Sequence, residues 1–338
     1  DGEAERLYGR LKSLIGDYEI VFNSWSDDFT KVVVEATSDR LPAIYYLYDA
    51  ETDELRFLHR VAPWLEEEEL AAMEPITYEA RDGLTIHGYL TLPKGVEAKQ
   101  LPVIVHPHAG PQWRNSWGYD ARAQFFANRG YAVLQVNFRG STGFGKGFVN
   151  AGDRQWAAAM HDDLIDAVDW AIEQGIATPD KIAIAGGSYG GYATLVGVTF
   201  TPEKFACGVD IVGPSSLVTL VESFPEYWKP FLEGTWFKYV GDPADPEQRQ
   251  DMLDRSAISR VDDIAVPLLI GQGANDPRVK QAESDQIVQA MQENEIPVTY
   301  VLYSDEGHGF ARPENRLSFN AVAEAFLASC LEGRYEPI

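Results

Sequence analysis

The sequence has few cysteines, few basic residues and no long apolar stretch, and each shortage excludes a class of protein. Its 338 residues include two cysteines, Cys207 and Cys330, which can form one bridge but neither a disulfide framework nor a four-ligand zinc site by themselves. The longest wholly apolar runs, such as Val266–Ile270, are far shorter than the roughly 20 residues that cross a bilayer. We therefore expect no membrane insertion.

Basic residues are scarce because 28 Lys and Arg stand against 52 Asp and Glu, a net charge of −24. A surface this acidic repels phosphate backbones, so we expect no nucleic-acid partner, only a well-solvated exterior. No signal peptide is visible, and the chain begins at Asp1 rather than Met. We expect a trimmed product whose export signal would have been lost, so a cytoplasmic and a periplasmic location both stay open.

Residues 1–75 are predicted to form a small all-β appendage behind one helix. Apolar residues at helical spacing indicate a helix over Glu3–Ile15. Four short strands follow at Tyr18–Asn23, Lys31–Thr37, Ala43–Asp49 and Glu54–His59, separated by turn signals. Four meandering strands are the size of one β-propeller blade, and no second copy of the pattern occurs. A lone blade must pack on the rest of the chain or associate with a missing N-terminal propeller portion.

Residues 76–338 alternate strands with helices, which predicts an α/β fold. A leading hairpin, Thr77–Glu79 with Thr85–Thr91, precedes buried strands at 101–106, 131–136, 181–185, 206–212, 267–271 and 298–303. Helices are expected at 121–129, 158–174, 189–199, 281–294 and 317–331. This alternation favours a mostly parallel sheet flanked by helices on both faces, with chemistry beyond the carboxyl ends of the strands.

The strongest local motif is Gly186-Gly187-Ser188-Tyr189-Gly190-Gly191, which closes one predicted strand and opens a helix. This is the setting of a nucleophile elbow, where neighbours without bulk let the serine adopt a strained backbone. The helix N-terminus would also favour a negatively charged oxygen beside Ser188. The alternative interpretation is a structural glycine turn.

A serine nucleophile needs a base, and the base needs an orienting carboxylate. Asp276 follows the predicted strand 267–271, and His308 lies between two glycines after the strand 298–303. Ser188, Asp276 and His308 therefore occur in the chain order of an α/β hydrolase, each after a strand end. We predict that these three residues form a catalytic triad.

The oxyanion of such an enzyme needs two hydrogen-bond donors. One should be the backbone N–H of Tyr189, directly after the nucleophile. The other should come from the loop His106-Pro107-His108-Ala109-Gly110-Pro111, through the N–H of Ala109 or the side chain of His108. The sequence does not decide between these two, and a plain Pro/Gly turn is the alternative.

Several segments together resemble the prolyl oligopeptidase family of serine peptidases, notably its acylaminoacyl-peptidase-like branch. The resemblance rests on the H-x-H-A-G-P loop, on Asn137-Phe138-Arg139-Gly140-Ser141-Thr142-Gly143, on G-G-S-Y-G-G-Y ending at Tyr192, on Asp276-Pro277-Arg278-Val279 and on D-E-G-H-G around His308. It covers residues 18–338. It implies an α/β-hydrolase domain joined to the last blade of a propeller that screens substrates by size.

The resemblance also implies roles for single residues. Ser188 would be the nucleophile, His308 the general base and acid, and Asp276 the orienting carboxylate. Arg278 matches an arginine that binds a substrate backbone carbonyl, although a surface salt bridge is the plainer interpretation. His108 stands where several family members have an oxyanion-donating tyrosine, and this departure favours the N–H of Ala109 as second donor.

The sequence says less about substrate preference. Seven aromatic residues lie between Pro214 and Val240: Phe224, Tyr227, Trp228, Phe231, Trp236, Phe237 and Tyr239. With Tyr189 and Tyr192 they could line an apolar side-chain pocket beside Ser188, or they could pack on the core or on an oligomer surface.

No cofactor and no metal are expected. His161-Asp162-Asp163 could mimic metal ligands, but acids at a helix N-terminus explain it better. We therefore predict a serine hydrolase that acts on short peptides or acyl-peptides and could form a homo-oligomer. A carboxylesterase and a non-catalytic hydrolase-fold binding module are the alternatives.

Overall fold

The computed structural model describes residues 2–337; residues 1 and 338, with which the two predicted domain ranges begin and end, lie outside the described part. The chain packs as two compact units. One holds the residues up to Glu74 together with 91–96 and 116–128, and the other holds 75–90, 97–115 and the residues from Arg129 onward. The division into two domains that was expected between residues 75 and 76 stays a prediction.

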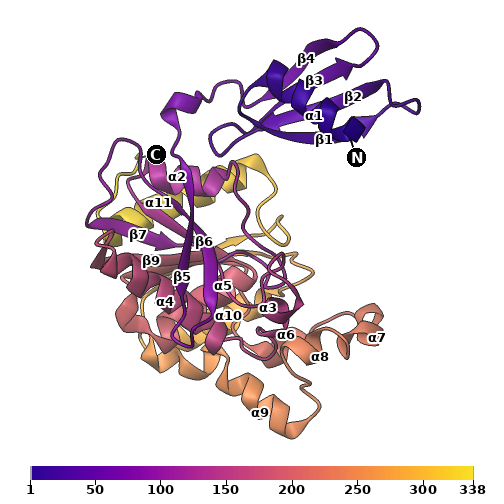
Figure 1. The fold of residues 1–338 in the computed structure, drawn as a ribbon. Helices are drawn as coiled ribbons and strands as arrows, with labels where there is room; N and C mark the ends of the chain where they lie inside the picture. The colour runs from indigo at the N-terminus through magenta and orange to yellow at the C-terminus, as the bar shows by residue number, and fades with distance from the viewer. Residues whose placement is uncertain (1, 338) are drawn as a thin grey trace. The chain divides into compact units, whose positions relative to one another are not determined.

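The first unit contains a four-stranded antiparallel sheet in the order β1-β2-β3-β4. Its elements are α1 (Gly2–Ile15), β1 (Glu19–Trp25), β2 (Lys31–Thr37), β3 (Ala43–Asp49) and β4 (Glu54–Val61), so the four predicted short strands are confirmed. Leu11 of α1 packs with Ile20, Val32, Val34 and Tyr48 of the sheet. The helix therefore buries one sheet face within the unit itself (Figure 1). The unit also holds α2 (Ala121–Asn128).

The larger sheet has eight strands in the order β12-β11-β10-β9-β7-β8-β6-β5. In chain order they are β5 (Met73–Glu79), β6 (Thr85–Thr91), β7 (Leu101–Val105), β8 (Ala132–Asn137), β9 (Ala177–Gly187), β10 (Cys207–Ile211), β11 (Leu268–Gly273) and β12 (Val298–Tyr303). The strands from β12 to β8 in this order pair in parallel. Every residue of β8 and β11 is buried, because helices cover the sheet on both sides.

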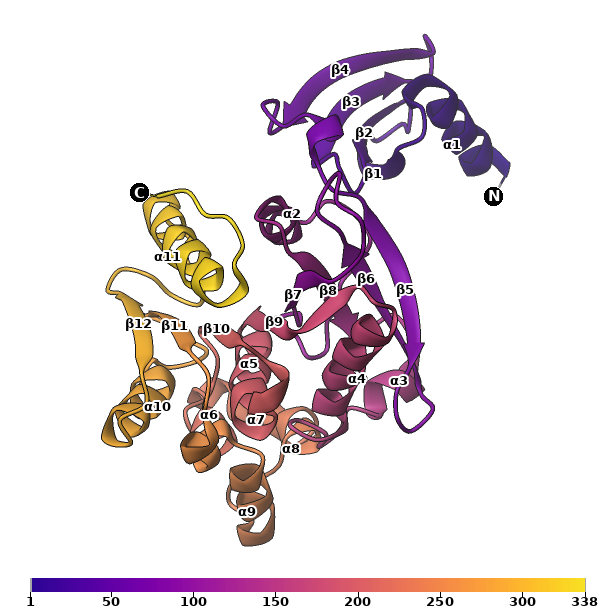
Figure 2. The same ribbon diagram turned by 90° about the vertical axis from the view of Figure 1, so that its left-hand side faces the viewer.

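The helices of this unit are α3 (Lys146–Asn150), α4 (Ala159–Glu173), α5 (Tyr189–Phe200), α6 (Leu217–Glu222), α7 (Lys229–Leu232), α8 (Trp236–Tyr239), α9 (Pro246–Asp254), α10 (Gln281–Glu293) and α11 (Pro313–Leu331). Figure 2 shows α11 on one face of the sheet and α4, α5 and α10 on the other. The predicted α/β fold with a mostly parallel, helix-flanked sheet is therefore confirmed. None of the helices in residues 2–337 is both long enough and apolar enough to cross a membrane.

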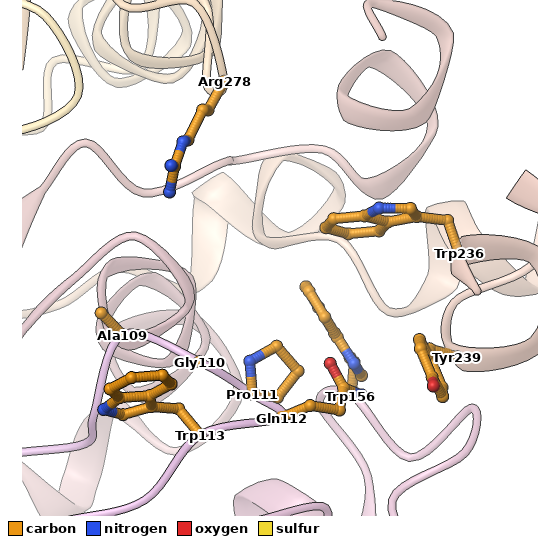
Figure 3. A pocket seen from close by; sticks show the side chains of 9 residues that line it. All are labelled: Ala109, Gly110, Pro111, Gln112, Trp113, Trp156, Trp236, Tyr239 and Arg278. Atoms are coloured by element: carbon orange, nitrogen blue, oxygen red, sulfur yellow. The ribbon is translucent and has the colours of Figure 1, made fainter. Parts of the chain in front are cut away.

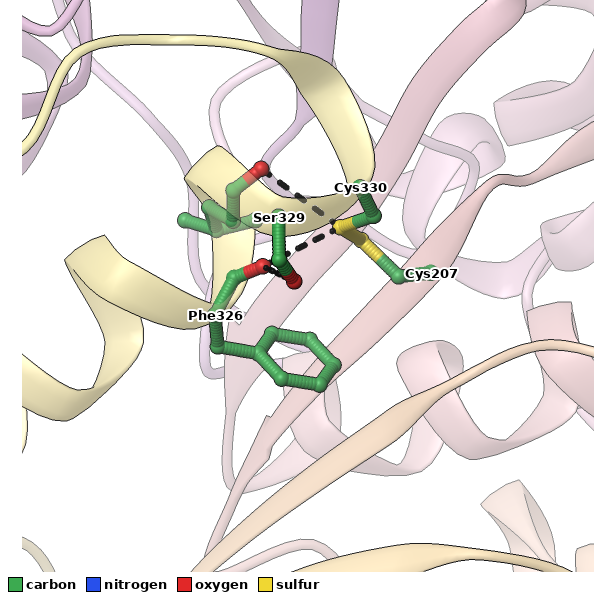
Figure 4. The surroundings of a disulfide bond; sticks show 5 residues. Cys207, Phe326, Ser329 and Cys330 are labelled. Carbon is green, nitrogen blue, oxygen red and sulfur yellow. Dashed lines mark hydrogen bonds between the residues drawn. A yellow bond between two sulfur atoms is a disulfide. The ribbon is translucent and has the colours of Figure 1, made fainter.

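One disulfide bond ties the sheet to the last helix. Cys207 on β10 is fully buried and bonds to Cys330 on α11, with the two Cα atoms 6.4 Å apart (Figure 4). The bond closes a loop between positions 123 residues apart. It holds α11 against an inner strand of the sheet, because β10 lies between β9 and β11.

Candidate active site

Ser188 lies at a sharp turn between β9 and α5. Its backbone has φ 56° and ψ −118°, a conformation that is strained for a residue with a side chain. Neighbouring glycines allow this turn: a Cβ atom on Gly186 would lie 2.5 Å from the carbonyl carbon of Gly190, and one on Gly190 would lie 2.4 Å from the Pro107 oxygen. The N–H of Ser188 donates to Ile211 O at 2.8 Å, which fixes the turn to the end of β10. The strain is thus held in place by close backbone packing.

Ser188 is hydrogen-bonded to His308, and His308 to Asp276. The Ser188 Oγ lies 2.9 Å from His308 Nε2, and the Asp276 Oδ2 lies 2.7 Å from His308 Nδ1. The Asp276 side chain is fully buried, and its other oxygen accepts the N–H groups of Arg278 at 2.8 Å and Val279 at 3.0 Å. An imidazole held in this way can accept the serine proton, while the buried carboxylate favours the resulting positive charge.

The loops that carry His308 and Asp276 meet because Gly273, at the end of β11, has no side chain. A Cβ atom there would lie 2.2 Å from Gly307 O. Glu306, two residues before His308, is buried and accepts the N–H groups of Ala311 and Arg312 at 2.9 Å each. Glu306 was not predicted, although its place in D-E-G-H-G was a signal available in the sequence.

The backbone amides of Tyr189 and Ala109 are the candidate oxyanion donors. Both residues line the same cavity as Ser188. Within residues 2–337, neither N–H has a hydrogen-bond acceptor in the protein. These amides can therefore serve an oxygen that belongs to a bound substrate.

The side chain of His108 is hydrogen-bonded to Ser141 and not to Ser188. Its Nε2 lies 2.8 Å from Ser141 Oγ, which itself donates to Phe138 O, and its Nδ1 accepts the N–H of Gly110 at 3.3 Å. The ring is buried and stacks on Phe138, and this burial, together with His106, lowers the pKa of His108 to about 3. Because both nitrogens are engaged, the expectation that this side chain could donate to the oxyanion does not fit the structure. The His108 side chain instead stabilises the loop that contains Ala109.

The loop that holds His108 is itself fixed by a buried ion pair. The backbone N–H and the guanidinium of Arg139 both donate to Asp163 at 2.8 Å, and Arg139 also binds Asp82 at 2.7 Å. Asp162 pairs with Arg81 at 2.7 Å. The two acids of His161-Asp162-Asp163 are thus engaged with arginines in the structure.

Two adjoining cavities open at this site. The serine cavity, of about 360 Å³, is lined by Ala109, Gly110, Trp156, Ser188, Tyr189, Pro214, Leu220, Phe224, Trp228, Trp236, Arg278 and Val279. The outer cavity, of about 420 Å³, shares Ala109, Gly110, Trp156, Trp236 and Arg278 and adds Pro111, Gln112, Trp113 and Tyr239. In Figure 3, Arg278 and the Ala109–Trp113 loop come from opposite sides of the outer cavity, and Trp156, Trp236 and Tyr239 lie along the remaining side. Aromatic side chains therefore supply five of the twelve residues that line the serine cavity and four of the nine that line the outer one.

Comparison with known proteins assigns the sequence to a family. The sequence profile of the prolyl oligopeptidase family matches residues 117–334. The chain belongs to the prolyl oligopeptidase family. It is 54% identical over 331 residues to dipeptidyl aminopeptidase BIII of Pseudoxanthomonas mexicana, covering 96% of this chain and 48% of that protein.

Two further proteins extend the comparison. The chain is 44% identical over 336 residues to dipeptidyl peptidase family member 6 of Caenorhabditis elegans, covering 93% of this chain and 45% of that protein. It superposes with a TM-score of 0.83 and 28% identity on a puromycin-hydrolyzing peptidase of Mycobacterium tuberculosis, covering 95% of this chain and 50% of that one. The chain thus spans about half the length of these relatives.

Arg278 and Tyr192, the two predicted substrate-binding residues, differ in their placement. Arg278 is exposed and borders both cavities, and its guanidinium has no hydrogen-bond or ion-pair partner within residues 2–337. Tyr192 is 1% exposed and lines neither cavity; its hydroxyl donates to Arg255 O at 2.6 Å. Tyr192 packs against Tyr189 and Trp156, so it supports the cavity wall from behind rather than facing either cavity.

Part of the aromatic segment lines the cavities, which was one of the two alternatives expected for it, and part is exposed. Phe224, Trp228 and Trp236 line the serine cavity, and Tyr239 lines the outer one. Tyr227 and Phe231 point outward and are 73% and 69% exposed. Trp156, which borders both cavities, was not predicted, because it comes from the loop between α3 and α4 and no local motif marks it.

A buried carboxyl group lies beneath the nucleophile turn. Asp210 on β10 is fully buried, and a Cβ atom on Gly191 would lie 2.3 Å from its Oδ1. That oxygen accepts the N–H of Gly213 at 2.9 Å, whereas Oδ2 has no partner within residues 2–337. Burial raises the pKa of Asp210 to about 7. Asp210 was not predicted, because no sequence motif marks it.

Proposed function

We propose that this chain is the catalytic part of a serine peptidase that cleaves peptide or acyl-aminoacyl bonds of short peptides. The observation that carries the proposal is the hydrogen-bonded array of Ser188, His308 and Asp276, of which Ser188 lines the serine cavity. Membership of the prolyl oligopeptidase family supports the same reaction class.

The geometry supports the following reaction. Ser188 Oγ attacks the substrate carbonyl carbon and its proton passes to His308 Nε2, while Asp276 stabilises the imidazolium. The N–H groups of Tyr189 and Ala109 hold the oxyanion of the tetrahedral intermediate. His308 then gives the proton to the departing amine, which leaves an ester on Ser188. Water, deprotonated by His308, hydrolyses this acyl-enzyme and restores the serine.

Two features favour a peptide over a simple ester as the substrate. The guanidinium of Arg278 borders both cavities and has no hydrogen-bond or ion-pair partner among the described residues, so it is available to a backbone carbonyl of a bound peptide. The outer cavity continues the aromatic surface beyond the serine cavity and offers room for a second residue. The names of the two curated relatives, a dipeptidyl aminopeptidase and a dipeptidyl peptidase, favour the release of short units.

A carboxylesterase is the second candidate, because it would use the same three residues and an apolar serine cavity suits a short acyl chain. A non-catalytic binding module is the third. The intact proton-transfer array argues against it, since a binding surface has no need of one.

The test compares p-nitrophenyl butyrate with acetyl-alanyl and dialanyl p-nitroanilides in the wild type, Ser188→Ala and Ser329→Ala. Ser329 is an exposed serine on α11 and serves as the matched control. Amide cleavage that only Ser188→Ala abolishes supports the peptidase. Ester cleavage alone supports the esterase. No Ser188-dependent turnover, together with no labelling of Ser188 by a fluorophosphonate, supports the binding module and overturns the proposal.

Compartment and assembly belong to the same proposal. The Cys207–Cys330 disulfide favours an oxidising compartment, such as the periplasm, over the cytoplasm. Self-association and association with an N-terminal propeller portion stay predictions, which light scattering of the purified chain, alone and with such a portion, would test.

A further inference from the structure

The serine cavity is built from two chain segments that are far apart in sequence. One is α6 with the residues after it, which supplies Leu220, Phe224 and Trp228. The other is the loop of the catalytic acid, which supplies Arg278 and Val279 and leads into α10. The shape of the cavity therefore depends on how α6 is fixed to α10.

Glu283 makes that connection. It lies in the first turn of α10, four residues after Val279, and is 2% exposed. Its Oε2 accepts the backbone N–H groups of Ser215 and Ser216 at 3.0 Å each, directly before α6. Its Oε1 accepts the hydroxyl of Thr219. Glu283 thus joins the helical turn after Val279 to the turn before Leu220.

The other contacts strengthen the same connection. The hydroxyl of Ser215 donates to the backbone carbonyl of Glu283 at 2.6 Å, and Gln286, on the next part of α10, donates to Oε2 at 3.0 Å. All of these partners are neutral, so the carboxylate depends on them for its solvation. Several donors on one short segment orient that segment more strictly than a single bond would.

We propose that Glu283 is a positioning residue of the serine cavity: by holding α6 against α10, it sets how tightly a substrate side chain is bound, without acting in the chemical step. The proposal rests on the proposed function, because it takes the serine cavity as the place of the substrate side chain. Glu283 lines neither cavity and has no hydrogen bond to Ser188, His308 or Asp276 among the described residues.

The test uses two activated esters that share a leaving group and differ in the acyl group, and therefore in their need for the cavity. p-Nitrophenyl acetate reaches Ser188 without filling it, whereas the p-nitrophenyl ester of acetyl-phenylalanine places a large side chain in it. Both are measured with the wild type, Glu283→Ala, Glu283→Gln and Thr219→Val. Glu293→Ala, an exposed acid on the same helix, is the control. Thermal unfolding checks that each variant is folded.

For Glu283→Ala we expect KM for the phenylalanine ester to rise about 10- to 100-fold with kcat within about 3-fold, and p-nitrophenyl acetate turnover to change less than about 3-fold, on the scale of a lost set of buried hydrogen bonds. Glu283→Gln keeps an acceptor oxygen and should recover most of the loss. Thr219→Val removes one contact and should show a smaller rise in KM.

Equal losses on both esters, or an unchanged KM for the phenylalanine ester in a folded variant, would overturn the proposal. If Glu283→Ala does not fold, the Gln and Val variants decide by the same criterion. A wild type that cleaves the acetate but shows no preference for the larger ester overturns the positioning role and leaves a serine hydrolase. A wild type without Ser188-dependent cleavage of either ester overturns the proposed function and this inference with it.

Discussion

Exchanging Asp276 for asparagine replaces one oxygen with an amino group, and the surrounding hydrogen bonds decide which way the new amide faces. Oδ1 of Asp276 accepts two backbone N–H groups, from Arg278 and Val279. An amino group in that position would face these two N–H groups and leave them without an acceptor. Each buried donor left unsatisfied costs about 1–3 kcal/mol. The amide oxygen of the asparagine must therefore stay there, and its amino group must face His308.

This orientation changes which nitrogen of the His308 imidazole carries the proton. Nδ1 of His308, which lies 2.7 Å from Asp276 Oδ2, would have to accept a hydrogen bond, so the proton would move to Nε2. A protonated Nε2 cannot take the proton of Ser188. A triad held in the wrong tautomer loses about 10⁴-fold in kcat, or about 5 kcal/mol of transition-state stabilisation.

We therefore expect Asp276→Asn to lower kcat about 10³- to 10⁴-fold with little change in thermal stability, since all backbone hydrogen bonds are kept. The assay is single-turnover release of p-nitrophenol, which reports acylation of Ser188 directly. Asp263→Asn, at an exposed site, is the control. A loss below about 10-fold, with the fold intact, would refute the assignment of Asp276 as the orienting carboxylate.

Three further predictions follow from the structure. Arg278→Ala should leave unfolding unchanged but raise KM for dialanyl p-nitroanilide at least about 10-fold, the scale of one charge-assisted hydrogen bond, and equal loss on p-nitrophenyl acetate would contradict this. The pKa of Asp210, raised to about 7 by burial, means that the folded chain keeps a proton that the unfolded chain loses near pH 4. The unfolding free energy should thus fall by about 2–3 kcal/mol between pH 5 and pH 8, and urea titrations of Asp210→Asn should lack this fall. Replacing Cys207 and Cys330 by serine opens a loop of 123 residues. Chain entropy then predicts a loss of about 5 kcal/mol in stability, and a change below about 1 kcal/mol in urea unfolding would mean that the loop is already ordered in the unfolded state.

Much of the fold was predictable because the strands of a covered parallel sheet are buried on both faces and are therefore mostly apolar. β8 and β11 are of this kind, and both were located within one or two residues. Errors fell at ends whose signals are weak. The last helix begins at Pro313 rather than at Leu317, because proline at the first helical position marks a start that the polar residues after it conceal.

The grouping of Ser188, Asp276 and His308 was predictable for a related reason. Its three residues follow β9, β11 and β12, which run in parallel, so their carboxyl ends lie at one edge of the sheet. Strand order alone brings Ser188, Asp276 and His308 together, and local glycines mark each turn. The second oxyanion donor was not decidable, because nothing near His108 in the sequence shows that Ser141, 33 residues later, binds its ring.

The substrate cavity follows no such rule, and this explains why Trp156 and Glu283 were missed. The walls come from insertions after β8 and β10, whose paths depend on contacts made at a distance rather than on the sheet. Parallel strands fix the positions of Ser188, Asp276 and His308. In the cavity wall, a carboxylate such as Glu283 fixes the position of α6 instead, by accepting hydrogen bonds from a segment more than 60 residues away. The two parts of the site should therefore respond differently to mutation: changes at the strand ends alter kcat, whereas changes in the contacts that fix α6 alter KM and selectivity.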